Sequence, residues 1–172
     1  MDDYKTGLGA IARGDAWLII FGSLPGDKSL AHQRYYAHPT NQFWRLLGGA
    51  IGEDLQSLDY EERLGRLADR GIGLWDVIGS ARRSGSLDQA IRDPRHNPLA
   101  EFVGQYRELR AVAFNGRTAA SIGRQSLARL GVDVALIDLP SSSAAHTRAF
   151  EEKAYDWAVL ARYCRPLAVT PR

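Results

Sequence analysis

The chain has 172 residues, of which 45% are hydrophobic and 24% are charged, and its formal net charge is +2. This length suits one domain, residues 1–172, with a sizeable core, and the composition excludes a disordered or collagen-like chain. The apolar stretches fall far short of the roughly 20 residues of a membrane span. The polar, acidic start is unlike a signal peptide. We therefore expect a soluble, cytoplasmic monomer without a membrane partner, and we expect residues 1–15 to be an irregular lead-in.

Cysteine and histidine give no sign of a metal centre. Cys164 is the single cysteine, so it can form neither an internal disulfide nor an iron–sulfur cluster. The four histidines show no recognised metal-ligand spacing. We expect no cofactor, no structural metal and no cluster, with Cys164 as a core residue.

Arginines gather in one region, at Arg82, Arg83, Arg92 and Arg95. A basic cluster can bind an anion such as DNA. A solvated surface is the favoured interpretation, because the net charge is small.

Apolar runs and helical patterns alternate along the chain. The runs predict four short strands, at residues 16–21, 73–78, 111–114 and 132–137. Residues 27–38 and 79–84 are expected to be loops, the first with a short helical turn. Helical patterns cover residues 39–51, 60–70, 97–106, 118–130 and 147–163, and a short helix starts at 86–88. The order predicts an α/β fold: a three-layer α/β/α sandwich with a short four-stranded parallel sheet.

Each predicted strand is followed by small or polar residues. The loops are 22–26, 76–80, 115–116 and 140–146. Parallel strands end at one edge of a sheet, so these loops can converge on one crevice. The chain has no dinucleotide-binding glycine motif, no nucleotide-triphosphate loop and no G-x-S-x-G elbow. What remains is amides, hydroxyls, aromatics and histidines, which suit a flat heterocycle and a water.

The densest polar and aromatic stretch is Tyr35-Tyr36-Ala37-His38-Pro39-Thr40-Asn41-Gln42-Phe43-Trp44. With Gly22-Ser23-Leu24-Pro25-Gly26, it resembles the first motif of the hypoxanthine-DNA (deoxyinosine) glycosylase group of the uracil-DNA glycosylase superfamily. Ala113-Phe114-Asn115-Gly116 is similar to that group's base-recognition strand end. Leu139-Pro140-Ser141-Ser142-Ser143-Ala144-Ala145 is similar to its DNA-clamping motif. The resemblance spans residues 16–165.

The resemblance implies a residue for each task. Asn41 would be catalytic and would orient a water. Residues in contact with the base would be Tyr35 or Tyr36 as the stacking ring, Asn115 at the edge, and Ser23 and Leu24. DNA-binding residues would be Pro25, Gly26, Ser141, Ser142, Ser143 and His146. Each has another reading: Asn41 as a helix cap, the tyrosines as core or surface rings, Asn115-Gly116 as a turn, and the serines as a capping loop.

Two positions depart from related motifs. Mismatch-specific uracil or thymine glycosylases have a water-positioning asparagine where this chain has Leu24, so Asn41 must carry that role here. The clamp motif usually ends in asparagine, where this chain has His146. For Asp76 we favour a buried acceptor of hydrogen bonds from loop N–H groups over a catalytic role, and we expect His38 to be structural.

The implied activity is that of a monofunctional DNA glycosylase of base excision repair, located at a bacterial nucleoid. It would act on a deaminated base, hypoxanthine foremost, in double-stranded DNA, with single-stranded DNA left open. No suitably placed lysine is visible, so no strand-cleaving lyase step is expected. Alternatives are a mismatch-specific (G·U) uracil-DNA glycosylase, a non-catalytic lesion-binding protein and a nucleobase or nucleoside binder.

Overall fold

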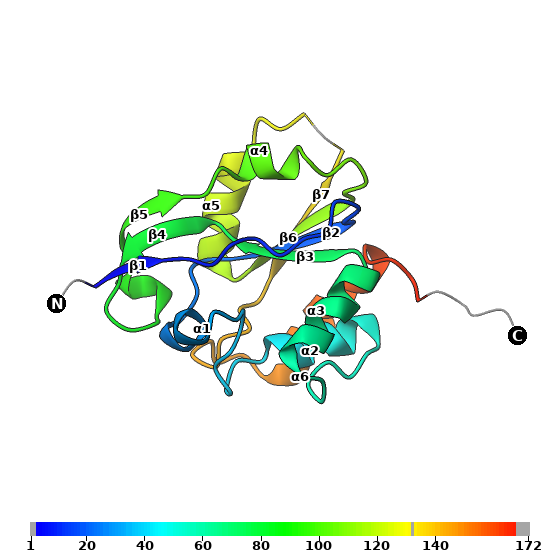
Figure 1. Cartoon of the computed structure of the whole chain (residues 1–172), viewed down its shortest axis with the longest axis horizontal. Helices are drawn as coiled ribbons and strands as arrows, with labels where there is room; N and C mark the ends of the chain where they lie inside the picture. Colours follow the sequence, from blue (N-terminus) through cyan, green and yellow to red (C-terminus); the bar gives the residue numbers. More distant parts are fainter. Residues whose placement is uncertain (1–2, 132, 168–172) are drawn as a thin grey trace, which may run out of the picture.

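A four-stranded parallel sheet lies at the centre of the computed structural model, which describes residues 3–131 and 133–167 (Figure 1). The strand order is β3-β2-β6-β7. The strands are β2 (Leu18–Gly22), β3 (Ile72–Asp76), β6 (Ala111–Asn115) and β7 (Ala135–Leu139). The predicted sheet is confirmed. The last strand starts at Ala135, which pairs with Ala111, and not at residue 132, which lies outside the described residues.

Helices cover both faces of this sheet, as Figure 1 shows. The helices are α1 (Asp27–His32), α2 (Phe43–Ile51), α3 (Tyr60–Asp69), α4 (Leu99–Val103), α5 (Arg117–Leu127) and α6 (Phe150–Trp157). Two 3-10 turns are η1 (Asp88–Ala90) and η2 (Ala158–Arg162). Helices α4 and α5 lie on one face, and α2, α3 and α6 lie on the other. The predicted three-layer sandwich is confirmed.

The side chains of β2 show why both faces must be covered. All five of its residues are buried. Leu18 and Ile20 belong to one apolar cluster, whereas Ile19 and Phe21 belong to the other. Successive residues of a strand point to opposite faces, so an uninterrupted apolar run places hydrophobic groups on both.

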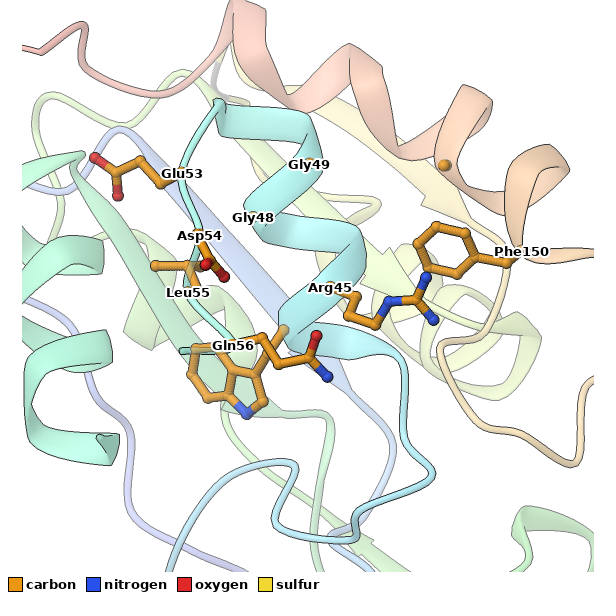
Figure 2. Close-up of a pocket in the computed structure, with 10 residues that line it drawn as sticks. Arg45, Gly48, Gly49, Glu53, Asp54, Leu55, Gln56 and Phe150 are labelled. Atoms are coloured by element: carbon orange, nitrogen blue, oxygen red, sulfur yellow. The ribbon is translucent and has the colours of Figure 1, made fainter. Parts of the chain in front are cut away.

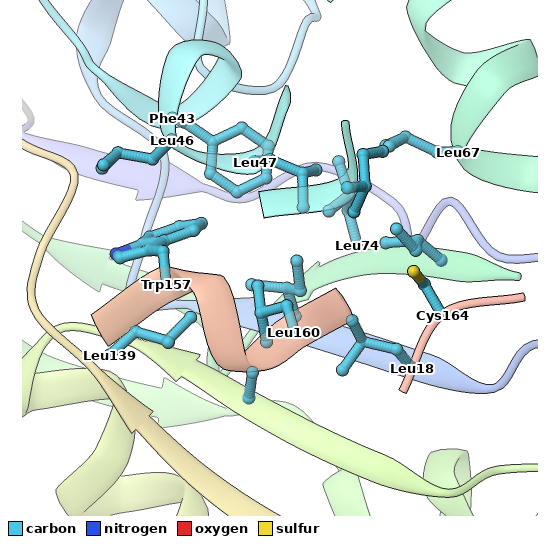
Figure 3. Packing of buried hydrophobic residues seen from close by; sticks show 14 of the residues in the cluster. Leu18, Phe43, Leu46, Leu47, Leu67, Leu74, Leu139, Trp157, Leu160 and Cys164 are labelled. Atoms are coloured by element: carbon cyan, nitrogen blue, oxygen red, sulfur yellow. The ribbon is translucent and has the colours of Figure 1, made fainter. Parts of the chain in front are cut away.

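The larger cluster joins the sheet to α2, α6 and η2 (Figure 3). Phe43 from α2 meets Trp157 from α6 edge to face, with ring centroids 5.6 Å apart. Cys164 is 5% exposed and belongs to this cluster, so its prediction as a core residue is confirmed. This packing holds the start of α2 against the sheet.

A second, antiparallel sheet was not predicted. It comprises β1 (Tyr4–Thr6), β4 (Ile78–Arg82) and β5 (Arg92–His96), in the order β1-β4-β5. The prediction of an irregular lead-in over residues 1–15 is therefore wrong at β1, and that of a loop over residues 79–84 is wrong at β4. Strands β4 and β5 lack a clear apolar alternation, and every residue of β5 is exposed.

The chain passes from one sheet to the other at Val77. Its N–H donates to the carbonyl of Gly22, and the N–H of Ile78 donates to that of Ser23. The single strand expected over residues 73–78 is therefore two strands. Pairing of β4 with β1, which is distant in sequence, and with β5 decides this.

Several helix ends differ from the prediction. Helix α2 begins at Phe43, and Pro39 lies in a preceding turn rather than at the helix start. Helix α4 begins after Pro98, because Asn97 donates its side-chain N–H to the carbonyl of Asp76 (2.8 Å) instead of capping the helix. Helix α5 ends at Leu127, and α6 gives way to η2. None of the described helices is both long and apolar enough to cross a membrane.

Replacing Gly123 in α5 with alanine should destabilise the fold. A Cβ at this position would lie 2.1 Å from Cε1 of Phe114, a fully buried ring of β6. We expect a loss of about 2 kcal/mol in the free energy of unfolding, because overpacking outweighs the better helix propensity of alanine. Urea denaturation measures this.

Gly65→Ala in α3 is the matched control, because nothing lies within 4 Å of its Cβ position. This variant should be more stable than the wild type by about 0.5–1 kcal/mol. Equal effects of the two substitutions would contradict the close approach of α5 to β6.

Candidate active site

The candidate site lies at the edge of the parallel sheet where its strands end. Gly22 pairs with Asp76, and Asn115 pairs with Leu139. The residues that follow β2, β3, β6 and β7 therefore converge, as expected for parallel strands.

Asn41, Asn115 and Ser142 form one hydrogen-bonded chain. Asn115 accepts from the backbone N–H of Ser142 at its Oδ1 (2.9 Å) and donates from Nδ2 to Ser142 Oγ (2.8 Å). Ser142 Oγ then donates to Asn41 Oδ1 (2.9 Å). Asn115 and Ser142 are 9% and 1% exposed. The structure thus brings together three predicted site residues that lie far apart in the sequence.

The orientation of the Asn41 amide is fixed by two donors. Its Oδ1 accepts from Ser142 Oγ and from the backbone N–H of Phe43 (3.0 Å), the first residue of α2. Asn41 therefore stabilises the start of α2, as expected from its alternative interpretation as a helix cap. Both lone pairs of Oδ1 are engaged, so Nδ2 is the group with hydrogen-bonding capacity left for a ligand or water.

The two neighbouring tyrosines differ in what they expose. Tyr35 is 2% exposed, and its hydroxyl donates to the carbonyl of Gly9 (2.9 Å). The expectation that Tyr35 contacts the base is corrected, because its ring lies in the core. Tyr36 is half-buried and stacks one face on Phe43, with centroids 3.7 Å apart and planes 8° from parallel. Its hydroxyl accepts from Asn115 Nδ2 (3.3 Å), which places the ring at the site.

The glycine-rich loop after β2 divides between the site and the core. Leu24 is 6% exposed and packs in the cluster with Val77 and Leu99, on the sheet face opposite Tyr36. The Leu24 side chain therefore lies in the core and is not available to a base, and a contact through its backbone stays a prediction. Ser23 is half-buried, and its Oγ donates to Asp88 Oδ1 (2.6 Å).

Arg83 supports this loop, a role that the sequence did not suggest. The residue is 1% exposed, so it is not part of a solvated arginine cluster. Its guanidinium donates to the carbonyls of Leu24 (3.2 Å), Pro25 and Gly85 (2.9 Å). Burial lowers its pKa. Pro25 is buried and Gly26 is half-buried, and their contact with DNA stays a prediction.

A buried lysine joins α6 to the clamp segment, which we define as residues 139–145. Lys153 is 0% exposed and donates from Nζ to Gln42 Oε1 (3.0 Å) and to the carbonyl of Ser143 (3.2 Å). Burial, followed by Arg148, lowers its pKa. Lys153 lies at helical spacing between Phe150 and Trp157. A lysine on the apolar face of a predicted helix was therefore the sequence feature that could have indicated a buried polar contact.

Lys153 bears on the expected absence of a lyase step, because it is a lysine beside the clamp segment. Its ammonium is enclosed and hydrogen-bonded, which gives no support to a nucleophilic role in this conformation. The absence of a lyase step therefore stays a prediction.

The remaining predicted DNA contacts lie at or beside the clamp segment. Ser141 Oγ accepts from the N–H of Ser143 (3.2 Å), and Ser143 Oγ accepts from that of Ala145 (3.2 Å). His146 is half-buried, and its Nδ1 is buried without a hydrogen-bond partner among the described residues. Burial lowers its pKa, and Lys153, Arg148 and Arg117 lower it further. This cationic surrounding suits a phosphate, and contact of these residues with DNA stays a prediction.

Asp76 does not have the partners expected from the sequence. Its carboxylate accepts no hydrogen bond from a loop N–H group within the described part of the chain, and its Oδ2 is buried without a partner. Its backbone carbonyl, by contrast, accepts from Asn97.

A hollow of about 320 Å³ lies elsewhere, beside α2 and α6 (Figure 2). Its lining includes Arg45, Gly48, Gly49 and Phe150, with the Arg45 guanidinium 4.0 Å from the ring centroid of Phe150. None of the predicted site residues lines it. The described residues also contain no group of three or more His, Cys, Asp or Glu side chains arranged to hold a metal ion.

The parallel sheet with an amide, a hydroxyl and a stacked tyrosine at its strand ends is the arrangement expected for a base-excising enzyme. Residues 8–162 match the Uracil DNA glycosylase superfamily, and the chain belongs to this family.

Individual relatives are similar to this chain over most of its length. It is 38% identical over 159 residues to a Methanosarcina acetivorans protein named "Hypoxanthine DNA glycosylase". This alignment covers 92% of this chain and 99% of that protein. A Methanosarcina barkeri protein of the same name is 38% identical over 154 residues, or 90% and 96% of the two chains. The solution NMR structure of a Methanosarcina acetivorans protein described as a uracil DNA glycosylase superposes with a TM-score of 0.82. The identity is 38%, over 92% of this chain and 97% of that one.

Proposed function

We propose that this protein is a monofunctional DNA glycosylase that hydrolyses the N-glycosidic bond of deoxyinosine in DNA, releasing hypoxanthine and leaving an abasic site. The observation that carries the proposal is the chain Asn41–Ser142–Asn115 beside the partly buried ring of Tyr36. Relatives 38% identical over almost their whole length are named for this activity. The proposal includes a monomer that acts in the cytoplasm on duplex DNA.

The target nucleotide must leave the helix before it can react. A base inside a duplex is shielded by its neighbours, so the enzyme rotates the nucleotide outward at an unstacking cost of a few kcal/mol. Serines 141 to 143 and the cations near His146 would hold the flanking phosphates. Tyr36 would then stack on the extruded base with the ring face that Phe43 does not cover.

Asn115 would bind the edge of that base. Its Nδ2 makes a 2.8 Å bond to Ser142 Oγ and a longer 3.3 Å bond to the Tyr36 hydroxyl. The longer bond is the weaker one. A base oxygen could therefore replace the Tyr36 hydroxyl while Ser142 continues to hold the amide in place.

Asn41 would hold the water that attacks C1′. An amide is a poor base, so its contribution is orientation, and Nδ2 is the group available to donate to the water oxygen. Bond cleavage develops positive charge on the sugar and negative charge on the leaving base. Hydrogen-bond donors at the base edge, including Asn115, would stabilise that negative charge.

Labelled duplexes that contain a single deoxyinosine or deoxyuridine test the proposal. After incubation and alkali treatment, strand scission at deoxyinosine is the expected result. Scission only at deoxyuridine opposite guanine would favour a mismatch uracil glycosylase. Salt-dependent binding to deoxyinosine DNA without base release would instead favour a non-catalytic lesion binder.

Replacing Tyr36 with alanine should lower kcat/KM for hypoxanthine release by about 10- to 100-fold, because stacking on an aromatic ring contributes about 1–3 kcal/mol per base. Tyr36→Phe keeps the ring and loses only the hydroxyl, so it should retain most of the activity. Single-turnover kinetics at varied enzyme concentration measure both. Tyr155→Ala, at a ring that is 84% exposed on α6, is the control. Equal losses in Tyr36→Ala and Tyr36→Phe would argue against stacking.

A further inference from the structure

Asp76 is a buried carboxyl group that the mechanism above does not use. It is the last residue of β3 and is 4% exposed. Its Oδ2 is buried and has no hydrogen-bond partner among the described residues. An ionised carboxylate without partners is costly to bury, so the uncharged acid is favoured here.

The charged and titratable groups around Asp76 do not compensate for the cost of burying its ionised form. Burial, together with the negative charge of Asp88 in η1, raises the pKa of Asp76 to about 7 against the opposing effect of Arg83. Tyr35 and Tyr36 face it from the segment before α2, and Asp76 contributes to the raised pKa of both hydroxyls. The guanidinium of Arg83 is committed to loop carbonyls, so it forms no ion pair with Asp76.

The position of the carboxyl places it at the candidate base site. A Cβ added to Gly22 would lie 2.6 Å from Asp76 Oδ1 and 3.0 Å from the Tyr36 hydroxyl. Both oxygen atoms therefore lie close to Gly22, and a side chain at this position would collide with them. The Tyr36 hydroxyl is also bonded to Asn115 Nδ2, so Asp76 lies at the same strand-end edge as the predicted base contacts.

We propose that Asp76 is a further specificity-determining residue, whose uncharged carboxyl group donates a hydrogen bond to the O6/N7 edge of the extruded hypoxanthine. This inference rests on the proposed function and names a contact within that same site.

The chemistry of the purine edge explains why a donor would be selective. An oxo-purine presents two acceptors there, O6 and N7, whereas adenine replaces the O6 acceptor with an amino donor. A protonated carboxyl and the Asn115 amide are both donors, so they match the oxo-purine and leave the adenine amino group without an acceptor. A carboxylic acid kept neutral by its apolar surroundings can donate in this way to a developing oxyanion. Adenine would then be rejected, whereas guanine, which presents the same O6 and N7 acceptors, is not distinguished at this edge.

The test is the pH dependence of hypoxanthine release from a deoxyinosine duplex, measured in single turnover at saturating enzyme. The donor is lost when Asp76 ionises, so the wild-type rate should fall as the pH rises through about 7. Above the midpoint the fall should approach about tenfold for each pH unit. Asp76→Asn supplies a donor that does not ionise, and its rate should stay nearly constant over the same range.

Asp88→Asn provides a second variant that leaves position 76 intact. Because Asp88 raises the pKa of Asp76, its replacement should move the wild-type midpoint to lower pH. Asp93→Asn, on the exposed strand β5, controls for the loss of one carboxylate and should leave the profile unchanged.

Three outcomes would overturn the inference. The first is a wild-type rate that does not change through neutral pH, and the second is a fall that persists in Asp76→Asn. In both cases the wild type still releases hypoxanthine, so the proposed function stands while the role of Asp76 fails. A wild-type protein that releases no hypoxanthine at any pH would overturn the proposed function and this inference together.

Discussion

Replacing Asn41 with alanine should lower the single-turnover rate of hypoxanthine release by about 10²- to 10³-fold, while the affinity for the duplex stays nearly unchanged. Misplacing the attacking water by about 1 Å can cost about 10²-fold in rate, so the group that orients the water must be held in place before the reaction. Asn41 meets this condition, because Ser142 and the N–H of Phe43 fix its Oδ1 and leave Nδ2 for the water. Fluorescence anisotropy of a labelled duplex measures affinity separately from rate.

Asn41 also stabilises the start of α2, so the activity loss must be separated from a folding defect. Alanine removes the acceptor for the Phe43 N–H, which should cost about 1 kcal/mol of stability. Asn41→Ser is the matched control, since a serine hydroxyl can still accept from that N–H. It should restore most of the stability and none of the activity. Recovery of hypoxanthine release in Asn41→Ser would show that Asn41 acts through the helix start alone.

Asp76→Asn should make the free energy of unfolding less dependent on pH. In the wild type, the pKa of Asp76 is raised from 3.8 to about 7 in the folded protein. The folded state therefore binds more protons than the unfolded state between these values, and stability is lost as the pH rises through the folded pKa. This one group should remove about 3 kcal/mol between pH 5 and pH 9, which the variant would not lose.

Urea denaturation of both proteins at a series of pH values measures this difference. The stability of Asp76→Asn relative to the wild type should grow with pH and level off above about pH 8. Asp93→Asn should give a curve parallel to that of the wild type, because Asp93 lies on the exposed strand β5. Parallel curves for Asp76→Asn and wild type would contradict the burial of an ionisable carboxyl at the strand end.

The central sheet and its covering helices could be predicted from the sequence. The run at β2 is apolar at every position, and helices α2, α3 and α6 carry apolar stripes at helical spacing. Such patterns are local, so they survive without knowledge of the partner elements. The small sheet was missed for the converse reason: β4 and β5 are defined by pairing with each other, and β5 buries none of its residues.

The chemical identity of the site was likewise present in the sequence, in Asn41, Tyr36, Asn115 and Ser142, because these residues follow recognisable strand ends and motifs. Their assembly into one hydrogen-bonded chain is a tertiary result, since Ser142 meets Asn41 across 101 positions.

Only the tertiary structure decided which neighbouring side chain faces the site and which enters the core. Tyr35 and Leu24 are buried, while the adjacent Tyr36 and Ser23 are only partly buried. The orientation of a loop residue depends on the elements that pack on it, and no sequence period encodes that. The same holds for three buried polar side chains. Lys153 and Arg83 donate to loop carbonyls, whereas Asp76 Oδ2 has no hydrogen-bond partner among the described residues.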